Sequence, residues 1–142
     1  MSAADQLLNA INQCGVKLLK LMHDTQVQLN DDVAAGNLHD AGVLRAKMQD
    51  ISFTLGEVLN RQLTDIDTSQ DMKKAIAAFS VVNKSITATL NELSNVNKFV
   101  TSLNSVLGDV NTALGLALKK PGAGGAGGTG GNKSGAAKSG NA

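Results

Sequence analysis

Cysteine, proline and aromatic residues are scarce in this sequence of 142 residues, which holds one cysteine, one proline, three phenylalanines and no tryptophan or tyrosine. A single cysteine excludes a disulfide within the chain. The apolar residues are mainly leucine, valine, isoleucine, alanine and methionine, a set that suits helix packing and gives no sign of a sheet. We therefore expect an all-α protein.

Charge divides the chain into two parts. Residues 119–142 hold four lysines, no acidic residue and nine of the fifteen glycines, whereas residues 1–118 hold nine Lys or Arg against twelve Asp or Glu. These charges are small and aromatic residues are few, so we predict no nucleic-acid binding. We expect a helical bundle over residues 1–118. Residues 119–142 should form a flexible tail of Gly, Ala, Ser and Lys, which buries too little apolar surface to fold.

The first half of the chain predicts two helices joined by a turn. Ser2, followed three residues later by an acidic residue, resembles the capping box at the start of a helix. Apolar residues then recur on one helical stripe. Gly36 suits the residue after a helix, because glycine adopts positive φ at little cost, and Asn37 suits the next N-cap. We expect an antiparallel hairpin of helices at about residues 3–35 and 38–66.

The second half carries a long heptad repeat of apolar residues. Between Met72 and Ala117, steps of three and four residues meet thirteen apolar side chains in fourteen positions. One structure that fits is a single long helix over about residues 69–118. The other is a break near Ser94 that gives two helices and a four-helix bundle. The unbroken phase favours one helix, so we expect an elongated antiparallel bundle in which the hairpin packs on a long third helix.

Three rows of residues flank this heptad repeat and give the candidate interaction residues. An exposed helix back normally carries Lys and Glu, but these rows are asparagine-rich, small or apolar. The first row includes Asn83, Asn97, Asn104 and Asn111, the second Thr87, Thr101, Gly108 and Gly115, and the third Phe99 and Val106. The hypothesis is a helix buried on more than one side, in its own bundle and again in an oligomer. The alternative is a single bundle whose back is rich in Ser, Thr and Asn.

No residue pattern predicts an active site, a cofactor site or a metal site. His23 and His39 lack a second His or Cys three or four residues away, as a helical metal pair requires. Asp31 and Asp32 lack the spaced ligands of a calcium loop. Cys14 lies among apolar helix positions, where we expect a buried, unreactive thiol. We expect a protein that is not an enzyme.

By elimination, the expected role is structural or interaction-based, with a second copy or another helical protein as partner. The alternative is a membrane- or granule-surface role for residues 99–118, which are apolar over a wide arc and end next to lysines, and which could also form a pore. The sequence shows no signal peptide and no apolar run long enough to span a membrane. We therefore expect a cytoplasmic protein or one exported by a route without a signal peptide.

Overall fold

The structure, a computed structural model that describes residues 2–119, is a bundle of four helices. The helices are α1 (Ala3–Ala34), α2 (Leu38–Leu59), α3 (Met72–Leu90) and α4 (Val96–Ala117), with a short 3-10 helix η1 (Leu63–Asp65) after α2. Residues 2–119 contain no strand, so the prediction of an all-α protein is confirmed. The predicted tail, apart from Lys119, lies outside the described residues.

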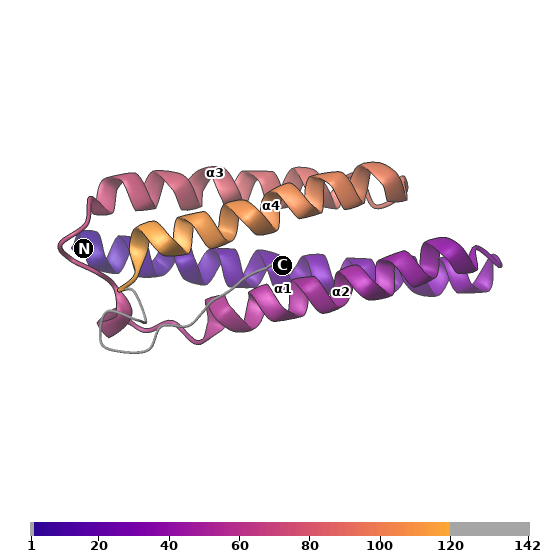
Figure 1. Cartoon of the computed structure of the whole chain (residues 1–142), viewed down its shortest axis with the longest axis horizontal. Helices are drawn as coiled ribbons and strands as arrows, with labels where there is room; N and C mark the ends of the chain where they lie inside the picture. The colour runs from indigo at the N-terminus through magenta and orange to yellow at the C-terminus, as the bar shows by residue number, and fades with distance from the viewer. Residues whose placement is uncertain (1, 120–142) are drawn as a thin grey trace.

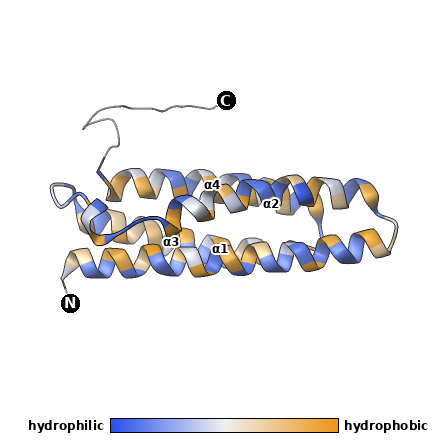
Figure 2. Cartoon of the chain, turned by 90° about the horizontal axis from the view of Figure 1, so that it is seen from below, coloured by the Kyte–Doolittle hydropathy of each residue, from blue (hydrophilic) through white to orange (hydrophobic). Residues whose placement is uncertain are grey.

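The four helices form two antiparallel hairpins stacked as two layers (Figure 1). Helix α1 packs against α2 and α3, while α4 packs against α3 and α2, so the layers meet along α1–α3 and α2–α4. At one end of the bundle, the α1–α2 hairpin extends beyond the turn between α3 and α4 (Figure 1). Apolar and polar positions alternate along every helix, as expected for helices with one face in a core (Figure 2).

The preferred prediction of one long third helix is wrong, and the four-helix alternative is confirmed. Helix α3 ends at Leu90, and α4 begins at Val96. Asn95 provides the local reason, because its Oδ1 accepts a hydrogen bond from the Lys98 amide at 3.2 Å and so caps α4. The spacing of apolar residues by three and four continues across the turn, because α3 and α4 both direct their apolar faces to the same core.

The predicted turn after α1 is confirmed in position. Gly36 has φ +82°, a conformation that favours glycine. Ser2 caps α1 as predicted, since its Oγ accepts a hydrogen bond from the Asp5 amide at 3.1 Å. Asn37 occupies the N-cap position of α2, but its side chain makes no capping hydrogen bond. Geometry at Gly36 therefore contributes more to this turn than the asparagine side chain does.

The second helix ends at Leu59, earlier than the predicted end near residue 66. The residues that follow are held against the end of α4. Ile66 is buried and forms an isolated antiparallel bridge with Leu118, and the Asp67 amide donates to the Ala117 carbonyl oxygen at 2.9 Å. A helix continued to Ile66 could not make this extended pairing.

Helix α3 begins a few residues later than the predicted start near residue 69, because Thr68 and Ser69 lie in the loop before it. Asp71 caps the helix, and its Oδ1 accepts hydrogen bonds from the Lys73 and Lys74 amides at 3.1 and 3.3 Å.

The core lies along the axis of the bundle and takes side chains from all four helices. Its largest fully buried members include Leu18 and Leu21 of α1, Leu44 and Ile51 of α2, Phe79 and Ile86 of α3, and Phe99 and Leu103 of α4. Cys14 is buried in the same core, as predicted. Burial raises the pKa of the Cys14 thiol to about 12, so the thiol stays protonated and unreactive at neutral pH.

Candidate interaction surfaces

The ten candidate interaction residues fall into a buried group and an exposed group. Asn83, Phe99 and Val106 are buried inside the bundle. The other seven are exposed, one of them, Thr87, on α3. The remaining six lie along the outside of α4 and form what we call the α4 polar row: Asn97, Thr101, Asn104, Gly108, Asn111 and Gly115.

Polar side chains from these rows hydrogen-bond across helices within the chain. Three such bonds join neighbouring helices: Asn83 Nδ2 donates to the Ala10 carbonyl oxygen at 3.4 Å, Lys47 Nζ donates to Asn104 Oδ1 at 2.9 Å, and Lys17 Nζ donates to Thr87 Oγ1 at 2.9 Å. They connect α3 to α1, α2 to α4 and α1 to α3. Part of the asparagine pattern therefore serves the register of the bundle itself.

Packing within the chain does not explain the two glycines of the α4 polar row. A methyl group added at Gly108 or Gly115 would meet no atom within 4 Å. Glycine inside a helix costs about 0.5–1 kcal/mol relative to alanine. Gly15 of α1 differs, because a methyl group there would lie 3.1 Å from Leu59 Cδ2. At Gly15 the small residue allows α1 and α2 to approach closely.

The exposed apolar side chains lie mainly on the other hairpin. Nine large apolar side chains are exposed among the described residues: Val16, Leu19, Val27 and Val33 of α1, Leu38, Phe53 and Leu59 of α2, Leu63 of η1 and Val81 of α3. Seven of the nine lie on α1 and α2, and we call the outward surface of these two helices the hairpin face. Phe53, one of three aromatic residues in the chain, is 73% exposed.

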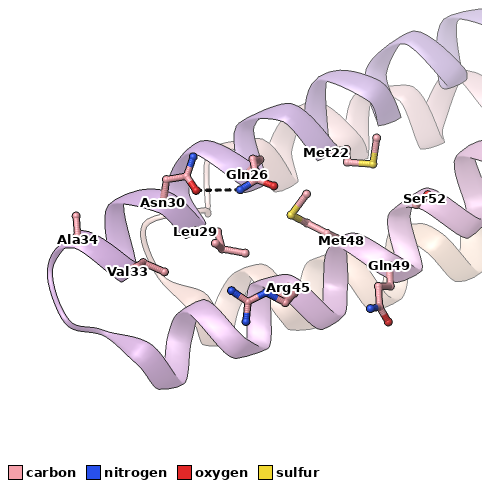
Figure 3. Close-up of a pocket in the computed structure, with 10 residues that line it drawn as sticks. All are labelled: Met22, Gln26, Leu29, Asn30, Val33, Ala34, Arg45, Met48, Gln49 and Ser52. Carbon is pink, nitrogen blue, oxygen red and sulfur yellow. Dashed lines mark hydrogen bonds between the residues drawn. The ribbon is translucent and has the colours of Figure 1, made fainter.

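A groove between α1 and α2 forms one end of the hairpin face (Figure 3). Its volume is about 720 Å³, and Met22, Leu29, Val33 and Met48 are its apolar lining. Met22, Leu29 and Met48 point into the space between the helices, and the Gln26 amide donates to Asn30 Oδ1 at 2.9 Å beside them (Figure 3). Methionine adapts its shape to different contacts, which suits a surface that receives another side chain.

The hairpin face was not predicted from the sequence. Apolar residues such as Val16 and Leu19 lie outside the apolar stripe of α1 from which the helix is predicted. The available signal was an excess of apolar residues over what one stripe needs in this helix. Phe53 gave a similar signal, since it falls outside the repeat that places Ile51, Leu55 and Val58 in the core.

The apolar side chains of residues 99–118 are mostly turned inward. Phe99, Leu103, Val110 and Leu114 are among the buried residues of α4. None of the helices described here has the length and hydropathy needed to cross a bilayer. Within residues 2–119, no three His, Cys, Asp or Glu side chains come together as a metal site would require.

The chain matches no protein-family model, no curated protein and no solved structure.

Proposed function

We propose that this chain is a non-enzymatic structural protein that self-assembles, as a subunit or accessory of a larger assembly. The observation that supports this role is the hairpin face, where seven of the nine exposed large apolar side chains lie on two adjacent helices. Scattered apolar residues are normal on a protein surface, but a concentration on one side is typical of an interaction site.

The α4 polar row is a second surface available for assembly. Its residues are small or carry an amide, so the backbone of a neighbouring helix could come close and hydrogen-bond to them. Asn104 already accepts a hydrogen bond from Lys47, whereas Gly108 and Gly115 have open space around them. The row has no exposed large apolar side chain, so it supports assembly less strongly than the hairpin face does.

Light scattering of the full chain over a wide concentration range, combined with negative-stain microscopy, tests self-assembly. The expected result is a mass above that of one chain that rises with concentration. A single-chain mass at the highest concentration, with no particles in the images, would rule out this proposal.

Membrane or granule-surface activity of residues 99–118 is the alternative function. Because their apolar side chains are buried, α4 could insert into a bilayer only if the bundle opened. Co-sedimentation with liposomes of neutral and of anionic lipids, for the full chain and for the chain ending at residue 98, tests this alternative. Binding by the full chain alone would favour it.

A further inference from the structure

We infer that the hairpin face is the contact surface between two copies of this chain, paired antiparallel about a two-fold axis near Met22 and Ser52. This inference rests on the proposed self-assembly and adds the surface, the partner and the symmetry. Three properties of the hairpin face support it, besides the apolar content described above: its relief, the low charge of its groove and its area.

The relief of the hairpin face suits a second copy of the same face. Leu19 and Leu59 are both exposed large side chains, and Leu59 lies over Gly15 while Leu19 is one turn further along the same side of α1; we call this pair the ridge. Next along the hairpin comes the groove between Met22 and Val33. A two-fold axis between ridge and groove places each copy's ridge over the groove of the other copy.

The position of the axis follows from the register of the hairpin. Gly15 packs against Leu59, so a step of seven residues along each antiparallel helix brings Met22 level with Ser52. Ser52 is exposed and lines the groove. An axis at this level lies between the ridge and the greater part of the groove. With this axis, α1 of one copy packs antiparallel to α1 of the other copy, and α2 packs antiparallel to α2.

Few charges lie in the groove of the hairpin face. Lys20 and Asp24, two residues on either side of Met22, point about 200° round α1 from it and form an ion pair of 3.0 Å with each other. The groove is lined by one charged residue, Arg45, with apolar and uncharged polar residues around it. A second copy on this surface therefore has few charges to desolvate.

The available area is in the range that a stable dimer needs. Twenty-two residues of α2 at about 1.5 Å each give the hairpin face a length of about 33 Å, and two adjacent helices are about 20 Å wide. The projected area of the hairpin face is therefore about 660 Å², and the uneven surface of the side chains increases the area that a partner can cover. A standard interface buries about 800 Å² on each partner.

Two matched substitutions test the surface. Val16 of the hairpin face and Val81 of α3 are the same residue type, with exposures of 68% and 62%. Sedimentation velocity of the full-length wild type, Val16→Glu and Val81→Glu is measured over a concentration series, with circular dichroism as the check on folding. We expect Val16→Glu to weaken dimerisation at least about tenfold, because a carboxylate would be desolvated in the contact. Val81→Glu should stay within about twofold of wild type.

The outcomes separate this inference from the proposed function. A wild type that self-associates, with Val16→Glu unaffected or with Val81→Glu impaired at least as much, would overturn the hairpin face while self-assembly stood. A wild type that is a single chain at every concentration would overturn the proposed function, and this inference with it.

Disulfide trapping tests the symmetry and does not depend on a destabilising charge. In Ser52→Cys, the two introduced thiols should meet at the axis and form a cross-linked dimer on oxidation with diamide. Ser105→Cys, at an exposed position on α4, is the matched control and should stay uncross-linked. Both variants keep buried Cys14. Cross-linking at position 105 and none at position 52 would contradict the antiparallel pair.

Discussion

The α1–α2 hairpin and the α3–α4 hairpin supply the same kind of core but have different outward surfaces. Both bury leucine, isoleucine and valine against the bundle axis, and the second adds Phe79 and Phe99. Outside, α1 and α2 carry seven exposed large apolar side chains, whereas α3 carries Val81 and α4 carries none of those described. One amphipathic face per helix is sufficient for a four-helix core. The additional apolar side chains of the first hairpin therefore need another explanation, and a protein contact provides one.

The largest expected effect compares two phenylalanines, one from each hairpin. Phe99→Ala should destabilise the fold by about 3–5 kcal/mol, because a fully buried aromatic ring leaves a cavity. Phe53→Ala should change the stability of the isolated chain by less than about 0.5 kcal/mol, because the ring is exposed. Urea unfolding at a concentration low enough to keep the chain monomeric measures both. Equal losses would contradict the contrast in burial.

The next effect concerns the inner side of α1 and depends on pH. The folded-state pKa of Cys14 is raised from 9.0 to about 12, so the fold favours the protonated thiol. The stability linked to this preference is complete below pH 9 and is lost as pH rises toward 12, by up to about 1.4 kcal/mol per pH unit. Urea unfolding of wild type and Cys14→Ala between pH 8 and 10.5 measures the difference. Parallel pH profiles would mean that Cys14 is accessible to water in the folded chain.

A smaller effect compares the turns of the two hairpins. Asn95→Ala should cost about 1 kcal/mol, because it removes the cap on the Lys98 amide. Asn37→Ala should cost a few tenths of a kcal/mol, because Asn37 makes no capping hydrogen bond with its side chain. Chemical unfolding of both variants decides the order. A larger loss at Asn37 would show that the first turn also depends on its asparagine.

The smallest effect concerns the α4 polar row. Gly108→Ala should stabilise the monomer by about 0.5–1 kcal/mol, because alanine favours the helix and its methyl group meets no neighbour. If the hairpin face is the dimer contact, the same variant should self-associate like wild type. Thermal unfolding and sedimentation velocity give the two readouts. A loss of association would instead place a contact on α4.

The heptad repeat predicted most of the core but not the turn within it. Phe79, Val82 and Ile86 are buried on one side of the turn, and Leu103, Leu107 and Val110 on the other, as the repeat requires. A repeat records only which residues face the core. When a helix folds back on the same core, the phase can continue, and the spacing then looks like that of one helix. The local signal for the turn was Asn95, a good N-cap residue.

The end of α2 and the hairpin face depend on tertiary contacts that the local sequence does not contain. Leu63 and Ile66 extend the apolar pattern of α2, but Ile66 pairs with Leu118, more than fifty residues away. Exposure of Phe53 or Val16 likewise depends on which sides of α2 and α1 the second hairpin covers. Four amphipathic helices can stack in more than one order, and the sequence pattern alone does not choose among them.

Hydroxyl-radical footprinting of the wild-type chain at low and at high concentration tests the central difference between the two hairpins most directly. The oxidation rates of Phe53, Leu59 and Met48 should fall at high concentration, because a second copy covers the hairpin face. The rate at Val81, which has similar exposure to Leu59, should stay the same. Unchanged rates at Phe53, Leu59 and Met48, in a sample shown to be oligomeric, would contradict the account.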